Sequence, residues 1–261
     1  MSKLRTLAII DYVKQRKYCS SSDLARAFDV SPATIQRDIA EIVQQNILRK
    51  VHGGIATLEG DAEPETLAVN RHFTERINVN PEKKRLMARL AEQQIESGDI
   101  LFLDSSTTAL YLARQLQKST LSHLTIVTNS VLIIQEFYLM PPQFSLISLG
   151  GTFNFQLNSF LGRTALENLR QLRIGKAFFS AVGMSKEGLF TYNENHAEFL
   201  KQIIEIADVS YLMLDSSKFN KTALFPICNP SQIQSLITDT PPPEDIALFI
   251  PSVILENSQP H

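Results

Sequence analysis

The sequence predicts an α/β protein with two domains: a small, mainly helical N-terminal domain and a larger domain built on a mainly parallel sheet. Residues 1–58 carry apolar residues at the spacing of amphipathic helices. Residues 81–261 alternate short, wholly apolar runs with segments of helix length, which is typical of a parallel sheet covered on both faces. Residues 59–80 are polar and acidic, and we expect a linker there.

The two predicted domains differ in charge. The 261 residues have a formal net charge of −2. Residues 1–58 contain nine Lys/Arg and five Asp/Glu and so carry +4, whereas the rest contains 16 basic and 22 acidic residues and carries −6. A basic domain joined to an acidic one indicates a division of labour, although ordinary scatter of surface charge would also give a bias of this size.

Other composition features exclude several classes of protein. No apolar run reaches the roughly 18 residues that cross a bilayer, so we expect no membrane partner. Cys19 and Cys228 are too few for a disulfide framework or a zinc site. We therefore expect a cytoplasmic protein that holds no metal and no cofactor.

Three helices are predicted in the first domain. Apolar residues from Thr6 to Val13 follow the i, i+3, i+4, i+7 pattern and predict a helix over residues 3–16. The Ser-Asp stretch at residues 20–23 caps a short second helix. After a turn at residues 29–32, a third helix runs from about Pro32 to Gln45, with Ser31 as its N-cap.

The third predicted helix has two unlike faces. One face is apolar and faces a core: Ile35, Ile39 and Ile42. The other is polar: Thr34, Gln36, Arg37, Asp38 and Glu41. A short helix, a tight turn and a helix with polar residues near its start, here about residues 20–39, can enter the DNA major groove. Arg37 can contact guanine and Gln36 adenine, while Thr34 and Ser31 suit phosphates.

A basic hairpin is predicted after this helix. Short extended stretches flank Gly53-Gly54, and the hairpin carries Arg49, Lys50 and His52. Cations beside a DNA backbone add affinity that does not depend on sequence. The first domain is therefore predicted to be a winged helix-turn-helix in which Arg49, Lys50, His52 and Gly53 lie near DNA.

Residues 3–58 resemble the DNA-binding domain of the DeoR family of bacterial transcriptional regulators. The run VSPATIQRDI at residues 30–39 and the run LRKVHGG at residues 48–54 carry the resemblance. This sequence departs from the family at Gln36, where an arginine is usual, and at Asn46, where a glycine is usual. Gln36 implies that the bases read differ from those that relatives read.

Six apolar runs are predicted as strands of the second domain, most of them separated by helix-length segments: residues 100–103, 124–127, 144–149, 177–182, 211–214 and 235–239. Ligands of such sheets bind outside the carboxyl ends of the strands. Asp, Ser, Thr, Asn, Gly and Lys residues follow these runs. We therefore expect a ligand site at that edge of the sheet.

The most specific of these strand ends is Asp104-Ser105-Ser106-Thr107-Thr108, which opens a predicted helix over residues 107–118. Hydroxyls and free N–H groups at a helix start favour an anion such as phosphate, and Lys218, after another strand, supplies a counter-charge. The same residues could equally serve as an ordinary helix cap, and this alternative stays open. The segment is not a P-loop.

The second domain resembles the C-terminal sensor domain of the DeoR family, so that the resemblance covers nearly the whole chain. Segments such as Val127–Ser130, Leu149–Gly151 and Asp215–Phe219 carry it. That domain is similar to ribose-5-phosphate isomerase and glucosamine-6-phosphate deaminase, and in the family it senses phosphorylated sugars. The resemblance implies that a phosphate is held by Ser105, Ser106, Thr107 and Thr108. It implies that the pocket is lined by Asp104, Asn129, Gly151 and Lys218.

Two departures affect this predicted pocket. Ser106 stands where the family has a glycine, so it would be strained if the position required a positive φ. His196 and Leu200 stand where the family has a glutamate and a lysine. We expect His196 to be a surface residue at the start of a helix.

The resemblance implies a sequence-specific repressor of a carbohydrate-utilisation operon that binds double-stranded operator DNA as a homodimer or homotetramer and responds to a phosphorylated sugar. The alternative is a sugar-phosphate isomerase- or deaminase-like enzyme with an appended DNA-binding domain. Its candidate acids and bases would be Asp104, Glu194, His196 and Glu198, which show no clear paired spacing. We therefore expect no enzymatic activity. A third reading is a regulator that answers to a protein partner.

Overall fold

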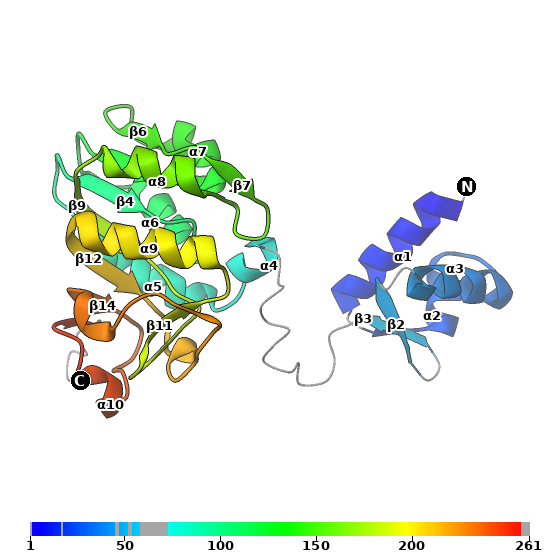
Figure 1. The fold of residues 1–261 in the computed structure, drawn as a ribbon. Coiled ribbons are helices and arrows are strands. Elements are labelled where there is room, and N and C mark those ends of the chain that lie inside the picture. Colours follow the sequence, from blue (N-terminus) through cyan, green and yellow to red (C-terminus); the bar gives the residue numbers. More distant parts are fainter. Residues whose placement is uncertain (1, 17, 45–46, 52–53, 58–72, 257–261) are drawn as a thin grey trace, which may run out of the picture. The chain divides into compact units, whose positions relative to one another are not determined.

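The computed structural model describes residues 2–16, 18–44, 47–51, 54–57 and 73–256 (Figure 1). The chain divides into two compact units, Met1–Val69 and Asn70–His261. The predicted fold class is confirmed, since the first unit is a winged helix-turn-helix and the second contains a seven-stranded parallel sheet. Within the described ranges, no helix combines the length and the apolar character that a bilayer crossing needs.

The first unit packs three helices against a small antiparallel sheet. The elements are α1 (Ser2–Arg16), β1 (Tyr18–Ser20), α2 (Ser21–Ala27), α3 (Pro32–Gln44), β2 (Leu48–Val51) and β3 (Gly54–Thr57). The sheet order is β1-β3-β2. Every element contributes to one core, which includes Ile9, Val13, Cys19, Leu24, Ile35, Ile39, Ile42, Leu48 and Ile55. The predicted apolar face of α3 is therefore buried as expected.

Strand β1 was not predicted, because three residues are too few to show a strand pattern. It pairs with β3 so closely that position 54 must be a glycine. A Cβ at Gly54 would overlap the carbonyl oxygen of Cys19 and would lie 2.8 Å from the Cα of Ser20. The glycine thus allows the wing to pack directly on the chain between α1 and α2.

Gly54→Ala should destabilise the first unit by about 1–3 kcal/mol, because the added methyl group pushes β1 away from β3. Hydrogen exchange of the α3 amides in the full chain would measure this as faster exchange than in the wild type. Ala40→Ser, on the exposed face of α3, is the control. Equal exchange in Gly54→Ala and wild type would show that the close approach is not required.

The sequence placed Asp38 on the polar outer face of α3, and that placement is wrong. Asp38 is buried and accepts two hydrogen bonds from Arg5 of α1, at 2.7 Å from Nε and 3.2 Å from Nη2. A guanidinium and a carboxylate paired in this way fix both distance and angle between two helices. Helical periodicity missed the pair because its members are 33 residues apart.

The second unit is built on seven parallel strands in the order β15-β14-β12-β9-β4-β5-β6. Their bounds are β4 (Ile100–Leu103), β5 (Thr125–Thr128), β6 (Ser145–Ser148), β9 (Ile174–Phe179), β12 (Ala207–Met213), β14 (Ser235–Ile237) and β15 (Val253–Ile254). Each of the first six overlaps a predicted run, although β9 and β12 begin three and four residues earlier than predicted. The chain order reverses between β4 and β9, so a ligand crevice is expected there.

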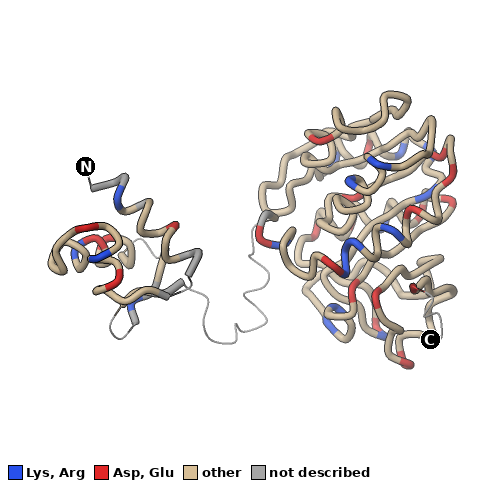
Figure 2. The backbone as a smooth tube through the Cα atoms, turned by 180° about the vertical axis from the view of Figure 1, so that it is seen from behind, with Lys and Arg blue, Asp and Glu red and all other residues tan. Residues whose placement is uncertain are grey.

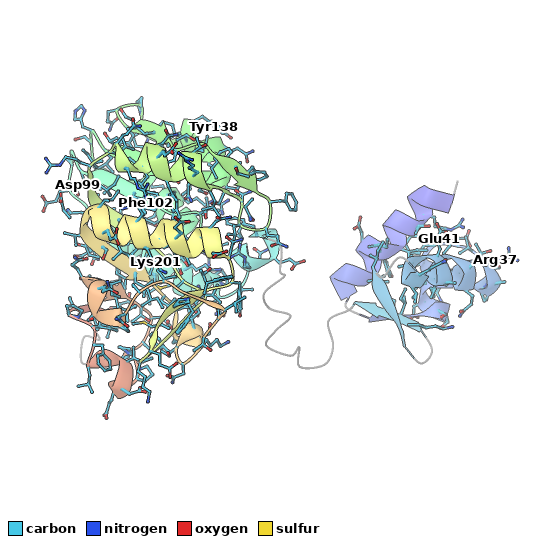
Figure 3. The ribbon with its side chains drawn as sticks, viewed as in Figure 1. Arg37, Glu41, Asp99, Phe102, Tyr138 and Lys201 are labelled. Atoms are coloured by element: carbon cyan, nitrogen blue, oxygen red, sulfur yellow. The ribbon has the colours of Figure 1, made fainter. Side chains whose placement is uncertain are left out.

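Helices cover both faces of this sheet (Figure 1). They are α4 (Phe73–Ile77), α5 (Pro81–Glu92), α6 (Thr107–Leu116), α7 (Val131–Glu136), α8 (Arg163–Arg170), α9 (Glu194–Ile206) and α10 (Glu244–Ala247). On β4, Leu101 and Leu103 belong to the core that contains α5 and α6. Phe102 belongs to the core that contains α8 and α9, and Figure 3 labels it beneath these helices. The strand is thus apolar throughout because both of its faces are buried.

Several small elements lie outside the predicted pattern. They are the hairpin β7 (Thr152–Asn154) and β8 (Ser159–Leu161), the sheet β10 (Gly183–Ser185), β11 (Gly188–Thr191) and β13 (Phe225–Pro226), and the single-turn helices η2 (Phe137–Leu139), η3 (Ser216–Lys218) and η4 (Pro230–Gln232). The short helix α4 falls within the stretch that the sequence assigned to the linker. It packs on the second unit through Phe73, which is buried in the core with α5 and α6.

Candidate DNA-binding face and effector site

The start of α3 has the geometry of a recognition helix. Asp29 adopts a left-handed φ of 49° in the turn from α2, a conformation that aspartate tolerates better than most residues. The Ser31 hydroxyl accepts a hydrogen bond from the Thr34 N–H at 3.3 Å and lies 2.9 Å from the Thr34 hydroxyl. Ser31 is therefore the N-cap that the sequence predicted, and both side chains lie beside the helix start that would face a DNA phosphate.

The two candidate base-reading residues are both exposed. Arg37 projects outward from α3 (Figure 3), and its guanidinium makes no ion pair with a described carboxylate. The Gln36 amide instead donates to the hydroxyl of Ser21 on α2 at 3.0 Å. Gln36 thus links the two helices of the motif through one of the two N–H groups of its side-chain amide.

The wing is only partly described. Lys50 is exposed on β2, and Arg49 pairs through its backbone with Ala56 of β3. The Arg49 side chain, His52 and Gly53 lie outside the described residues. Both basic and acidic residues lie along the described part of the first unit (Figure 2), and the net charge of +4 is that of residues 1–58.

The predicted effector residues follow neighbouring parallel strands, and hydrogen bonds join several of them at the point where the strand order reverses. Asp104 follows β4 and Ser180 follows β9, and these two strands are adjacent. The Asp104 carboxylate accepts a hydrogen bond from the Ser180 N–H at 3.1 Å. Lys218, after β12, donates to the Ser180 hydroxyl at 3.2 Å and to the carbonyl of Ala181 at 2.9 Å. Ser180, which the sequence reasoning did not select, therefore joins the two.

The Asp104 loop is held by its own serine. Ser106 has φ −71° and ψ 154°, so the strain considered for a residue replacing glycine does not arise. Its hydroxyl donates to Asp104 at 2.6 Å and accepts from the Ala109 N–H at 3.0 Å as the N-cap of α6. The hydroxyl of Ser106 is thus already used within the loop. The helix-cap reading holds for this residue, whatever the loop binds.

The other three loop residues are better placed for a ligand. Ser105, Thr107 and Thr108 are buried, and Thr107 and Thr108 begin α6. The first N–H groups of a helix have no acceptor within the helix, and the helix dipole adds positive potential there. A buried helix start with hydroxyls beside it suits an anion.

Asn129 follows β5, and within the described residues only the nitrogen of its side-chain amide has hydrogen-bond partners. Its Nδ2 donates to the Ser159 hydroxyl at 3.1 Å and to the Phe160 carbonyl at 3.2 Å. Its Oδ1 is buried and accepts no hydrogen bond within the described part of the chain. A buried oxygen without a donor costs free energy, so this position favours a ligand that carries a hydroxyl group.

Gly151 follows β6 and fits only as a glycine. Its φ is +118°, and a Cβ there would lie 2.8 Å from the Leu161 carbonyl and 3.0 Å from the Cβ of Ala165. Its role in lining the pocket stays a prediction, whereas the need for glycine has a structural reason, because the backbone passes close to the start of α8.

The structure adds two cations that the sequence reasoning missed, Arg76 on α4 and Lys84 on α5. Burial lowers the pKa of Lys84 to about 8, and the positive charges of Lys218 and Arg76 contribute to this shift. Burial also lowers the pKa of Lys218, which the nearby charges of Asp215 and Asp104 oppose. Arg76, Lys84 and Lys218 thus lie close enough to influence one another. Arg76 follows Glu75 in a stretch of the sequence that shows no helical periodicity, so the pattern gave no reason to select it.

The loop that carries Lys218 is held by an ion pair between Lys83 and Asp239. Lys83 of α5 lies 2.8 Å from Asp239 and donates to the Ser216 hydroxyl at 2.6 Å. Asp239 accepts from the Ser216 N–H at 2.6 Å. Asp239 therefore positions the turn that carries Lys218.

His196 was expected at the surface, and this expectation is wrong. It does stand at the start of α9, where its N–H donates to the Asn193 cap at 3.0 Å, but its side chain is buried. Its Nδ1 lies 3.0 Å from the Thr191 hydroxyl. Burial, with the charge of Arg76, lowers the pKa of His196 to about 4, so the ring is neutral. Leu200, one turn further, is part of the apolar core.

Two buried groups should give the second unit opposite pH dependences. Because the pKa of His196 falls from 6.5 to about 4 on folding, only the unfolded chain takes up this proton between those values. Acidification from pH 6.5 to pH 4 therefore lowers the free energy of unfolding by about 3 kcal/mol. Burial raises the pKa of Asp104 from 3.8 to about 6. Acidification from pH 6 to pH 3.8 therefore raises the free energy of unfolding by a similar amount.

As the pH falls from 7 to 4, the free energy of unfolding of His196→Gln should rise by about 3 kcal/mol relative to that of the wild type. The variant has lost the His196 contribution and keeps that of Asp104. Urea unfolding of both proteins at several pH values in this range measures the difference. Parallel stability curves would show that His196 keeps an ordinary pKa in the folded chain.

Two family models match this chain, one in each of its two units. Residues 5–60 match the family model of the DeoR-like helix-turn-helix domain. Residues 79–240 match that of the DeoR C terminal sensor domain. The chain belongs to the DeoR family.

Relatives within this family cover nearly the whole chain. The glycerol-3-phosphate regulon repressor of Escherichia coli (strain K12) is 30% identical over 91% of this chain and 91% of its own. The L-fucose operon activator of Haemophilus influenzae is 28% identical over 92% of this chain and 93% of its own. These DeoR-family relatives are named as transcriptional regulators, one a repressor and one an activator.

Among solved structures, a D-ribose-5-phosphate isomerase in complex with phospho-erythronic acid aligns with this DeoR-family chain. The match covers 53% of this chain and 54% of that chain, with 19% sequence identity and a TM-score of 0.37. A TM-score this low carries no argument about activity. In the described part of this chain, no three His, Cys, Asp or Glu side chains gather as a metal site.

Proposed function

We propose that this DNA-binding regulator of the DeoR family represses a carbohydrate-utilisation operon and responds to a phosphorylated sugar. The observation that carries the proposal is the set of groups at the reversal point of the sheet. The buried start of α6 offers N–H groups, Lys218 offers a positive charge, and Asn129 offers an oxygen without a donor. The first two suit a phosphate and the third suits a sugar hydroxyl.

The charges of the site support an anion. Arg76, Lys84 and Lys218 bring three cations, whereas Asp104 and Asp215 bring two carboxylates. Both oxygens of Asp104 already accept hydrogen bonds from Ser106 and Ser180. These formal charges sum to one positive charge, which attracts a phosphate strongly at low dielectric.

The proposed mechanism couples this site to the DNA-binding unit. Two copies of the chain, as a homodimer or within a homotetramer, present paired recognition helices to inverted half-sites. Effector binding changes the affinity for DNA by a coupling free energy of about 1–3 kcal/mol. The glycerol-3-phosphate regulon repressor among the relatives supports the repressor assignment.

Calorimetry of the full chain tests the effector class. The ligands are glycerol 3-phosphate, ribose 5-phosphate, fructose 6-phosphate and glucosamine 6-phosphate, each with its unphosphorylated counterpart as control. We expect saturable binding of at least one phosphate and none of the counterparts. If no sugar phosphate binds, the proposal fails.

One observation favours the enzymatic alternative, namely the raised pKa of Asp104, which is about 6 and would suit a general base. Against it, the Asp104 carboxylate accepts hydrogen bonds from two backbone N–H groups and one hydroxyl, which hold the loop together. Product analysis of the calorimetry samples decides the matter, because an isomerase or deaminase would convert the sugar phosphate during the titration.

A further inference from the structure

Helix α4 is fixed to the second unit by its backbone. Lys84 is 4% exposed, and its Nζ donates to the carbonyls of Arg76 at 2.5 Å and Val79 at 2.6 Å. The Tyr111 hydroxyl donates to the carbonyl of Ile77 at 3.3 Å. The last carbonyls of a helix have no partners within it, so a buried ammonium both satisfies them and is satisfied by them.

The side chain of Arg76 is held much more weakly than the backbone that carries it. Its Nη2 donates to the carbonyl of Gln156, in the β7–β8 hairpin, at 3.1 Å. Its guanidinium carbon lies 5.4 Å from the centre of the Phe73 ring. Among the described residues, no carboxylate forms an ion pair with it. A guanidinium has five N–H donors, and one neutral carbonyl is a poor substitute for an anion.

Arg76 is also electrostatically part of the effector site. Its positive charge acts on Lys84, Lys218 and His196, and the charge of Asp104 acts on Arg76. In Figure 1, α4 and the β7 hairpin lie on the side of the sheet to which the arrow of β12 points. A partly buried cation at this edge, without a paired carboxylate among the described residues, is placed to meet a bound anion.

We propose that Arg76 is a phosphate ligand of the effector site and that the bound phosphate fixes α4 through it. This inference rests on the function proposed above and adds a residue from outside the strand ends. In chain order, α4 is the described element of the second unit nearest to the DNA-binding unit. A phosphate held by Arg76 on one side and by Lys218 and the start of α6 on the other therefore links the ligand to the segment that leads to the DNA.

The test uses inorganic phosphate as the probe and the full chain as the protein. Phosphate affinity is measured by calorimetry in the wild type, in Arg76→Gln and in Arg85→Gln. Arg85 is a matched control, because it is exposed on α5, pairs with Glu82 and lies 6.0 Å from the Tyr111 ring. We expect at least a tenfold loss of affinity in Arg76→Gln and less than a twofold change in Arg85→Gln.

A second readout tests the link to α4. Hydrogen exchange of a peptide covering residues 73–77 should slow when phosphate is added to the wild type and should not respond in Arg76→Gln. If Arg76→Gln does not fold, Arg76→Lys replaces it. This variant keeps the charge but loses the two-pronged geometry, and its phosphate affinity should fall at least threefold.

The outcomes separate this inference from the proposed function. If the wild type binds phosphate and Arg76→Gln binds it equally well, the role of Arg76 is overturned while the phosphate site stands. An equal loss in both glutamine variants would also overturn it, because the effect would then be one of overall charge. If the wild type binds neither phosphate nor any sugar phosphate, both proposals fail together.

Discussion

Replacing Arg37 with alanine should remove base discrimination at one operator position, at a cost of about 1–3 kcal/mol there. Arg37 is exposed near the start of α3 and makes no ion pair with a described carboxylate, so its guanidinium is free to form two hydrogen bonds with a guanine. The substitution should leave the fold intact, since the core of the unit lies on the opposite face of the helix. Selection from random-sequence DNA, followed by binding measurements on single-base variants of the selected site, measures the effect.

Lys50→Ala is the matched control for this experiment. Lys50 is an exposed cation on the wing, where a contact to the DNA backbone is expected. Its removal should weaken all sequences alike and reduce the slope of log affinity against log salt by about 1. If Arg37→Ala behaves in the same way, Arg37 contacts a phosphate and reads no base.

Replacing Lys218 with methionine should abolish the effector response and leave operator binding in the absence of effector unchanged. Methionine keeps most of the side-chain volume, but it removes the ammonium that reaches Ser180 and Ala181. Loss of one charge-assisted hydrogen bond to a phosphate costs about 1.5–3 kcal/mol, or roughly tenfold to 150-fold in affinity. Calorimetry with a sugar phosphate, and operator binding with and without it, measure the two properties separately.

Lys201→Met provides the comparison for Lys218. Lys201 is exposed on α9 and projects from that helix in Figure 3, and the substitution removes the same charge from the same unit. It should bind the sugar phosphate as the wild type does. An unchanged response in Lys218→Met, or an equal loss in Lys201→Met, would remove Lys218 from the effector site.

The sequence predicted the parts of the fold that carry a periodic or repeated signal. The apolar run at residues 100–103 became β4, and the polar residues after it became the loop that begins α6. The same reasoning located the strand ends that gather Asp104, Asn129 and Lys218. These predictions succeeded because a strand that is buried on both faces of a parallel sheet is a nearly continuous apolar run.

What the sequence did not show depends on contacts between distant residues. Asp38 and Arg5 each look like ordinary surface charges until the two helices pack. His196 became buried because Thr191, on a short strand that was not predicted, supplies a partner for its ring. Arg76 was overlooked because a five-residue helix in a polar stretch has no periodicity to detect. Each of these side chains acquires its role only through tertiary structure.

Ser106 has one more consequence, which concerns when the binding loop acquires its shape. Its hydroxyl ties Asp104 to the first turn of α6. The loop is therefore preorganised, and an incoming phosphate loses little affinity to the ordering of backbone. A loop that does not change shape cannot report that the ligand has arrived. The effector response proposed above would then depend on side chains that exchange one partner for another, as proposed for Arg76.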